Sequence, residues 1–491
     1  MSNLTATETS VAMKMFINGE SVDSVSGERT EVRDPATGEP VATVPKGTRE
    51  DARRAIDAAA AAFPEWSETT AEDRARIMFK AHELVHAASD ELALLLCHEQ
   101  GKPVSEASTE IEHFLHGLSF YAALASKVRG EQVPLPSFPN KGAYGMVIKR
   151  PIGVCAGIVP WNFPITLMGT KIGPALAAGN TMVVKPAGST PVTAVRVVEL
   201  LNQAGLPKGV LNIVTGPGSV VGEELITNPN VRRVAFTGES GTGKHIMEMA
   251  GRDFKRVTLE LGGSDPMIVC DDADLDRAAT MASVGRFYNC GQACLAIKRL
   301  YVFEAVADQF IEKLLGKVKR LKVGEGIAKE TRIGPLHTDF QRQEVQEQVE
   351  DAVARGAKVL TGAKQVGGFK TTHFYEPTLL ENVPHDARIV QEECFGPALP
   401  IFRVKDIDQA IELANSSIYG LGSSIWTRDL AKANKAAFRL QAGVTWVNSL
   451  HYGYDELPFG GVKQSGIGRE HGPEALDYYY EPKSVVFAGL M

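Results

Sequence analysis

The sequence lacks several features, and each shortage excludes a class of protein. Its 52 lysines and arginines are outnumbered by 59 aspartates and glutamates, so no basic excess exists to attract nucleic acid. No apolar run reaches the length that crosses a membrane, and the N-terminus lacks a basic region followed by an apolar block. We therefore expect no nucleic-acid partner and no membrane partner.

Cysteine is also scarce. The six cysteines are Cys97, Cys155, Cys270, Cys290, Cys294 and Cys394. Such scattered positions in a large chain indicate free thiols in a reducing compartment, which favours a cytoplasmic location over a disulfide framework. Cys290 and Cys294 lie four apart, but no further cysteine or histidine follows at the short spacing of a metal site. The sequence thus predicts no metal centre.

The composition is that of a large globular protein. With 491 residues, 44% of them hydrophobic and 23% charged, the chain should divide into two or three domains. Lys14–Glu20 is predicted to be a strand that turns at Asn18-Gly19, and the pattern is helical from Thr48 to Ser126, with Pro64 expected to end the first helix. From Gly153, short apolar runs alternate with helical stretches, and a second such series begins at Leu275. This alternation predicts an α/β fold with parallel sheets covered by helices.

The segment Phe287–Cys294 is the first candidate for chemistry. A thiol nucleophile needs its thiolate where backbone N–H groups can face developing charge, and Gly291 allows a close backbone approach. The alternative is that Cys290 and Cys294 are small buried apolar residues, the commoner fate of a free cysteine. These residues alone leave both interpretations open.

Two further side chains suit acyl chemistry. Asn162 lies between Pro160 and Pro164, which stiffen the loop, and a rigid side-chain amide is what an oxyanion site requires. Glu260 ends a predicted strand beside Gly262-Gly263, where a carboxylate can reach into a cleft as a general base. A turn asparagine and a solvated glutamate are the alternatives.

A glycine-bearing turn suggests nucleotide binding. Gly238–Lys244 follows a predicted strand and opens a helix, and it fits G-x-x-x-x-G-K. The next residue is His245 rather than serine or threonine, so the hydroxyl that binds Mg²⁺ in nucleotide hydrolases is missing. The turn suits the pyrophosphate of a dinucleotide, although a simple tight turn is the alternative. Lys185 ends another predicted strand, where ligands bind in such folds.

Together these residues make the chain resemble the NAD(P)-dependent aldehyde dehydrogenase superfamily. Eight motifs occur in the family's order over residues 150–470. They are Pro160–Pro164, Lys185–Ala187, Phe236–Gly238 with Gly243, Glu260–Gly263, Asn289 with Gly291–Cys294, Glu393–Pro397, Trp446–Asn448 and Pro458–Gly466. The resemblance implies a Rossmann-like dinucleotide-binding domain (1–129 and 150–262), a second α/β catalytic domain (263–466), and a β-arm for oligomerisation (130–149 and 467–491). Homodimers or homotetramers are expected.

The resemblance also implies a mechanism that oxidises a small aldehyde to its acid. Cys294 attacks the aldehyde to give a thiohemiacetal, and the Asn162 amide with the Cys294 N–H holds the oxyanion. Oxidation by NAD(P)⁺ leaves a thioester, which water activated by Glu260 hydrolyses. Lys171 matches a lysine of the family's proton relay. Pro473 stands where some relatives carry a relay glutamate, which leaves a second relay carboxylate in doubt.

The remaining implied residues bind the cofactor or line the substrate tunnel. The cofactor set is Pro160, Trp161, Lys185, Ala187, Gly188, Ser189, Gly238, Glu239, Ser240, Gly243, Leu261, Glu393 and Phe395. The tunnel set is Phe163, Thr166, Leu167, Thr170, Tyr288, Leu295 and Phe459, with an outer loop over residues 450–456. Relatives that prefer NAD commonly carry glutamate at the Gly188 position, so NADP or dual use is expected here. No arginine clamp for a substrate carboxylate is evident.

Two other functions compete with this interpretation. The same scaffold could serve a binding or structural protein, although Cys294, Glu260, Asn162 and Lys185 speak against it. A nucleotide hydrolase built on Gly238–Lys244 should release phosphate in the presence of Mg²⁺, and we expect no such release. Reduced-cofactor absorbance with a panel of aldehydes discriminates between these functions and aldehyde oxidation.

Overall fold

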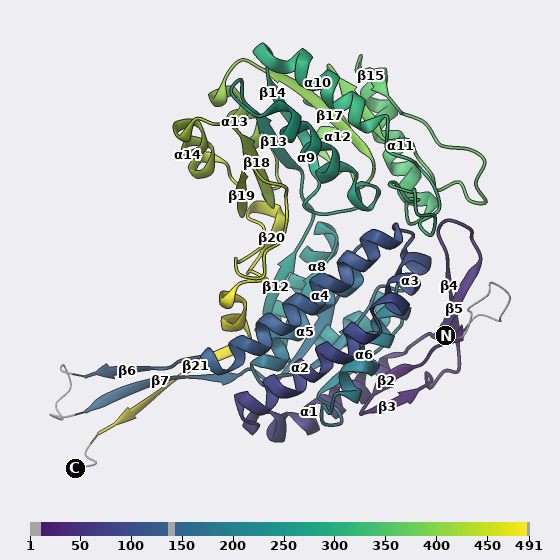
Figure 1. Cartoon of the computed structure of the whole chain (residues 1–491). Coiled ribbons are helices and arrows are strands. Elements are labelled where there is room, and N and C mark those ends of the chain that lie inside the picture. Colours follow the sequence, from purple (N-terminus) through teal and green to yellow (C-terminus); the bar gives the residue numbers. More distant parts are fainter. Residues whose placement is uncertain (1–10, 136–142, 489–491) are drawn as a thin grey trace.

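The computed structural model describes residues 11–135 and 143–488. Figure 1 shows two α/β units, one above the other, and a narrow arm of strands that projects from the lower unit. Residues 1–10 lie outside the described residues, as do the 136–142 and 489–491 parts of the proposed arm. Among the described residues, no helix combines the length and apolarity needed to cross a bilayer.

The lower unit is organised around an eight-stranded sheet. Its order is β20 (Gly466–Ile467), β12 (Arg256–Glu260), β11 (Val231–Thr237), β8 (Val154–Ile158), β9 (Thr181–Lys185), β10 (Leu211–Ile213), β2 (Met15–Ile17) and β3 (Glu20–Val22). The five strands from β12 to β10 are parallel. Because the chain passes from β8 outwards to β9 and later returns to β11 on the other side, the strand order reverses between β8 and β11. Ligands bind at this place in open α/β sheets.

Helices cover both faces of this sheet. They are α1 (Arg49–Glu68), α2 (Ala71–Ala87), α3 (Ser89–Gln100), α4 (Val104–Leu124), α5 (Pro164–Ala177), α6 (Val192–Gln203), α7 (Glu223–Thr227) and α8 (Ser240–Gly251). Alternate side chains of β9 enter different cores: Val184 packs with α2 to α6, and Val183 packs with α1, α7 and α8. The lower unit therefore has two cores, one on each face of the sheet.

The upper unit contains a seven-stranded sheet. Its order is β15 (Lys358–Thr361), β16 (Thr378–Glu381), β17 (Ala398–Val404), β14 (Ile297–Phe303), β13 (Asp265–Val269), β18 (Gly422–Trp426) and β19 (Val444–Val447). All pairs are parallel except β15 with β16. Its helices are α9 (Leu275–Phe287), α10 (Glu304–Val318), α11 (Asp339–Ala354), α12 (Arg388–Gln391), α13 (Ile407–Asn415) and α14 (Leu430–Arg439). One continuous apolar core joins them to the sheet.

Two small sheets complete the structure. One contains β1 (Val11–Ala12), β5 (Pro40–Pro45) and β4 (Arg29–Arg33), and the other contains β21 (Tyr480–Phe487), β7 (Tyr144–Pro151) and β6 (Glu131–Pro134). The second forms the projecting arm of Figure 1. Residues 467–479, which we had assigned to the arm, instead pair with β12 through Ile467 and pack on α5 through the 3₁₀ helix Pro473–Tyr479. At its C-terminal side, the arm that we propose therefore begins at Tyr480.

One predicted helix end is wrong. The first helix, α1, begins as expected with Thr48 and Asp51 in a capping box, but it continues through Pro64 to Glu68. Proline removes one helical hydrogen bond, which usually ends or kinks a helix. Here Trp66 lies beyond the proline and is fully buried in the core, so its burial offsets the cost of the missing bond.

Candidate active site

Cys294 lies in a loop whose backbone turns sharply after α9. Asn289, Cys290 and Gly291 adopt positive φ angles of 49°, 56° and 75° in succession, a conformation that is uncommon outside glycine. A Cβ on Gly291 would lie 2.4 Å from the Gly396 carbonyl oxygen, so glycine is required there. Cys290 joins the core of the upper unit, whereas Cys294 packs on a separate small cluster and lines a cavity. The two thiols therefore differ in environment.

Glu260 ends β12 with its side chain buried and unpartnered. The residue is 2% exposed, and neither carboxylate oxygen has a hydrogen-bond partner among the described residues. Burial raises the pKa of Glu260 to about 8, and the charge of Glu470 adds to this rise. Burial, with the charge of Glu260, also raises the pKa of the Cys294 thiol. A buried carboxyl with no structural partner is a candidate for proton transfer.

Both the side chain and the backbone carbonyl of Asn162 are hydrogen-bonded to the loop that carries Cys294. Its Nδ2 donates to the Gln292 carbonyl at 3.0 Å, and its own carbonyl accepts from Asn289 Nδ2 at 3.0 Å. An amide nitrogen carries two hydrogens, so one donor is left for another acceptor. These bonds hold the Asn162 side chain beside the loop that carries Cys294.

A buried ion pair fixes the Asn162 loop from behind. Lys102 Nζ pairs with the Glu110 carboxylate, both side chains having no exposed surface, and it donates to the Asn162 carbonyl at 2.8 Å. The other Glu110 oxygen accepts from Ile165 N at 2.8 Å and from Thr166 N at 3.3 Å. Since no side chain at Phe163 caps α5, Glu110 supplies the cap from α4. The pair thereby positions both Asn162 and α5.

Substitution of Lys102 by methionine is expected to lower kcat by about tenfold to a hundredfold, because a displacement of about 1 Å at a reacting group can cost a hundredfold. The measurement is kcat and KM well below the unfolding midpoint of the variant, since breaking a buried pair costs about 3–5 kcal/mol of stability. Glu381→Gln is the control, because its partner Arg403 lies away from this loop. An unchanged kcat in folded Lys102→Met would contradict the positioning role.

Lys171 is paired with a carboxylate, although Pro473 stands where some relatives carry the relay glutamate. Its Nζ lies 2.8 Å from Glu470 Oε1 and 2.7 Å from Thr237 Oγ1, and the ammonium is buried. The second Glu470 oxygen accepts from Thr170 Oγ1 at 2.8 Å. Lys171 lowers and Glu470 raises the pKa of Glu260, so the pair acts electrostatically on that carboxyl. The sequence does contain a second carboxylate, three residues before Pro473.

The carboxyl edge of the lower sheet fits a dinucleotide. Helix α8 begins at Ser240 directly after β11, and no side chain caps its first turn. Its free N–H groups therefore offer a site for an anion. Lys185, at the end of β9, is buried, and its Nζ donates to the Pro186 carbonyl. Burial lowers the pKa of Lys185 to about 8. Lys244 Nζ instead binds Gln464 Oε1 at 3.0 Å on the surface, which does not suit a phosphate-binding loop.

The expected contacts to the nicotinamide side form a connected group. Glu393 Oε1 accepts from Lys298 Nζ at 2.8 Å and from Gly263 N at 3.0 Å. Phe395 meets the Trp161 ring edge-on at 5.6 Å. The nearby residues Gly238, Gly243 and Leu261 pack closely, since a Cβ on Gly243 would lie 2.5 Å from the Leu261 side chain. The arrangement leaves Glu393 Oε2 as an acceptor for a ribose hydroxyl.

The segment expected to hold the adenosine ribose contains Ala187, Gly188 and Ser189. Ser189 Oγ is 2.7 Å from His337 Nε2, and the His337 ring stacks on Trp161 at 4.6 Å. Nothing lies within 4 Å of a Cβ placed on Gly188, so this position is open. Ser240 Oγ donates to the Gln464 carbonyl at 3.2 Å and thereby ties α8 to the upper unit.

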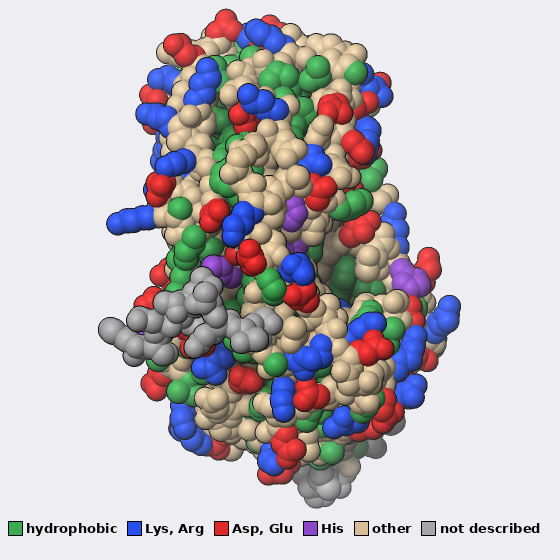
Figure 2. All heavy atoms as spheres, turned by 90° about the vertical axis from the view of Figure 1, so that its right-hand side faces the viewer, with side chains coloured by type: hydrophobic (Ala, Val, Ile, Leu, Met, Phe, Trp, Pro, Cys, Tyr) green, Lys and Arg blue, Asp and Glu red, His purple; other side chains and the backbone are tan. Residues whose placement is uncertain are grey.

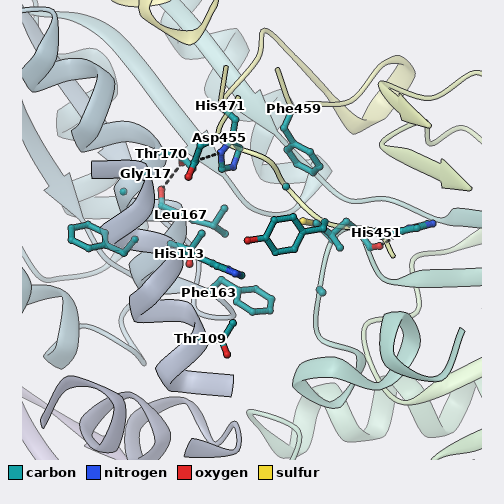
Figure 3. A pocket seen from close by; sticks show the side chains of 18 of the residues that line it. Thr109, His113, Gly117, Phe163, Leu167, Thr170, His451, Asp455, Phe459 and His471 are labelled. Carbon is teal, nitrogen blue, oxygen red and sulfur yellow. Dashed lines mark hydrogen bonds and ion pairs between the residues drawn. The ribbon is translucent and has the colours of Figure 1, made fainter. Parts of the chain in front are cut away.

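One cavity of about 260 Å³ reaches Cys294. All seven predicted tunnel residues lie in its wall, together with residues 450–453 and Asp455 of the predicted outer loop. Phe163 and Tyr288 stack across it with ring centres 6.0 Å apart. Figure 3 shows the labelled side chains of α4 and α5 facing those of the C-terminal loops. Figure 2 shows one face of the molecule hollowed between the two units, with acidic and basic side chains interspersed.

Several site residues were not predicted from the sequence. Lys298 lies in the fully buried strand β14 and binds the carbonyls of Ala293 and Cys294. A lysine inside an apolar strand was the available signal, since such a residue needs a special partner. His113 and His471 also line the cavity, and no motif indicated them. Among the described residues no group of three or more potential ligands forms a metal site.

A half-buried thiol on a cavity wall, an unpartnered carboxyl and a held amide beside a dinucleotide-binding sheet edge define a dehydrogenase of the covalent type. Residues 22–485 match the aldehyde dehydrogenase family. The chain is 43% identical over 468 residues to glutarate-semialdehyde dehydrogenase of Pseudomonas putida, covering 95% of this chain and 96% of the relative. It is 42% identical to betaine aldehyde dehydrogenase of Bacillus subtilis, covering 97% of each.

The solved structures agree with these relatives. Succinate-semialdehyde dehydrogenase from Burkholderia pseudomallei has a TM-score of 0.95 and 41% identity, covering 97% of this chain and 98% of that one. An NADP-dependent enzyme from Escherichia coli has a TM-score of 0.95 and 40% identity, covering 98% of each chain. The chain belongs to the aldehyde dehydrogenase family. It is an NAD(P)-dependent enzyme that oxidises an aldehyde to the carboxylic acid.

Proposed function

We propose that Cys294, Glu260 and Asn162 carry the aldehyde oxidation. The observation that carries this proposal is the buried Glu260 carboxyl, which has no hydrogen-bond partner among the described residues and whose pKa burial raises to about 8. As a carboxylate, Glu260 takes the thiol proton, and the sulfur then attacks the aldehyde carbon to form a thiohemiacetal. The remaining Asn162 N–H and the Cys294 backbone N–H receive the negative oxygen.

The second half of the reaction releases the acid. NAD(P)⁺, when bound, supplies the oxidising power by accepting a hydride. Glu393 would hold its ribose, and α8 with Lys185 would hold the pyrophosphate and adenosine ends. Glu260 passes its first proton to solvent and then deprotonates the water that attacks the thioester carbon. The Asn162 amide again receives the oxyanion, and the Cys294 sulfur leaves as a thiolate. The Lys171–Glu470 pair lies close enough to bias the Glu260 proton.

Aldehydes tested with both cofactors check this function directly. We expect reduced-cofactor absorbance to rise with at least one aliphatic or aromatic aldehyde and to form the matching acid in equal amount. A protein that binds these aldehydes without reducing either cofactor would contradict the proposal.

We propose NADP⁺ or dual cofactor use, resting on Gly188. Without a carboxylate at this position, nothing there repels a 2′-phosphate, and Lys185 is a nearby cation. Gly188→Glu is expected to shift the kcat/KM ratio towards NAD⁺ by about tenfold or more, through repulsion of the phosphate. The position is open, so the longer side chain fits.

Gly188→Gln is the matched control for this cofactor experiment, because it adds the same bulk without charge. The two variants are compared by kcat/KM for NAD⁺ and NADP⁺ at saturating aldehyde. A wild type strictly selective for NAD⁺, or an equal shift with glutamine, would contradict the proposed role of the charge.

We propose that the chain acts as a homodimer or homotetramer through the arm of β6, β7 and β21. The arm has two outer strands, β6 and β21, whose outer edges pair with no other described strand. An exposed strand edge is a template for pairing with another chain. Sedimentation of the full chain beside a chain that ends after Tyr479 checks this assembly.

A further inference from the structure

The lining of the substrate cavity contains one carboxylate and no basic side chain of lysine or arginine among the described residues. Asp455 is that carboxylate. His471 Nδ1 lies 2.8 Å from Asp455 Oδ1, and His116 Nδ1 lies 2.5 Å from Oδ2. Figure 3 shows the Asp455–His471 contact at the cavity wall. The carboxylate is thereby held in place at the edge of the substrate path.

The lysines nearest to this cavity are already neutralised. Each of the three is buried and paired with a carboxylate: Lys102 with Glu110, Lys171 with Glu470 and Lys298 with Glu393. Lys102 also lies behind the Phe163 ring, 4.0 Å from its centre, so the ring stands between that ammonium and the cavity. None of these three lysines is therefore free to pair with a substrate carboxylate.

Burial disfavours a positive charge on His113 but leaves Asp455 ionised. Burial lowers the pKa of His113, which meets the Tyr452 ring edge-on at 5.0 Å. Burial raises the pKa of Asp455, but hydrogen bonds from His471 and His116 outweigh it, so the net shift is downward. Asp455 therefore stays ionised at neutral pH, with the His471 and His116 rings against its two oxygens.

Further acidic and aromatic groups surround the same end. Burial raises the pKa of Tyr452, and the negative charges of Asp455, Glu456 and Glu112 add to that rise. The aromatic side chains that line the cavity include Phe163, Tyr288, Tyr452 and Phe459. Aromatic faces with one carboxylate attract an ammonium group, whereas carboxylate recognition relies on arginine or lysine.

We propose that Asp455 and the aromatic rings around it form a subsite for a positively charged nitrogen at the distal end of the aldehyde substrate. This specificity rests on the proposed function. It separates the chain from relatives of similar identity that are named for glutarate and succinate semialdehyde. Sequence identity alone does not distinguish a cationic from an anionic substrate, because the betaine aldehyde dehydrogenase is about equally similar.

The test compares aldehydes that differ in charge but not in shape. Betaine aldehyde and 3,3-dimethylbutanal have the same outline, with nitrogen replaced by carbon, and 4-trimethylammoniobutanal with 5,5-dimethylhexanal repeats the comparison at greater length. Succinate semialdehyde supplies the anion. We expect kcat/KM to be about tenfold or more higher for the cation of at least one pair, and lowest for the anion.

Asp455→Asn isolates the carboxylate. The variant is expected to lower kcat/KM for the cation by about tenfold while leaving that for its neutral partner nearly unchanged. Glu456→Gln is the control, because this adjacent carboxylate is exposed and does not line the cavity. Equal losses for both members of a pair would mean that the loop, not the charge, had been disturbed, and would overturn the proposal.

The wild-type comparison also stands without any variant. A preference for succinate semialdehyde, or equal kcat/KM for the charged and neutral members of both pairs, would overturn the subsite while leaving aldehyde oxidation intact. Absence of cofactor reduction with every aldehyde would instead contradict the proposed function.

Discussion

Replacing Cys294 with serine is expected to lower kcat by about a thousandfold or more, because a hydroxyl is a far weaker nucleophile than a thiolate. The cavity around residue 294 should be preserved, since serine is nearly the same size. Steady-state oxidation of a good aldehyde with saturating cofactor measures the loss. Cofactor binding, followed by fluorescence, should be unchanged.

Cys290→Ser provides the matched control. Cys290 lies four residues earlier but belongs to the core of the upper unit, and it does not line the cavity. Its activity should therefore remain close to that of the wild type. If the two variants lost activity equally, the loop fold rather than the Cys294 sulfur would explain the effect. We also expect Cys290 and Cys294 to form a protective disulfide under oxidation, and peroxide inactivation that is still reversible in Cys290→Ser would contradict this expectation.

Replacing Glu260 with glutamine is expected to lower the steady-state rate by about a hundredfold to a thousandfold, because general-base catalysis contributes at this level. Glutamine keeps the shape but accepts no proton. In this variant the Cys294 thiol can still lose its proton to water. One cofactor per subunit should therefore be reduced in a burst, after which turnover stalls at the thioester. Stopped-flow absorbance resolves the two phases.

The pH dependence follows from the same carboxyl. Because burial raises the pKa of Glu260 to about 8, the group holds its proton at lower pH and cannot act as a base there. The wild-type rate should accordingly rise with pH through about 8 and then level off. Glu260→Gln should lack this rise. A rise that persists unchanged in the variant would assign the titration to another group.

Much of the fold could be predicted because its determinants are local. The alternation of apolar runs and helical stretches from Gly153 predicted the strands β8 to β13. Pro64 failed as a helix end because Trp66, two residues later, is held by the tertiary core. Local sequence contains no information about that burial.

The site also contains residues that the sequence predicted and residues that it did not. The tunnel residues were predicted because they lie in the family motifs or a few residues from them, and the structure places all seven around one cavity. Glu470 was missed because its pairing joins α5 to a segment 299 residues later, so only the folded chain brings the two together. Asp455 and His471 belong to no motif, and their partnership likewise depends on how two C-terminal loops pack.

The most direct test is to locate the covalent intermediate. Glu260→Gln mixed with cofactor and aldehyde, quenched in acid and digested, should yield a peptide that contains Cys294 and is heavier by the acyl group. The peptide should be absent without cofactor, since the thioester forms only after oxidation. Acyl mass on another residue, or no acyl mass after a full burst of cofactor reduction, would contradict the central claim that this sulfur carries the substrate.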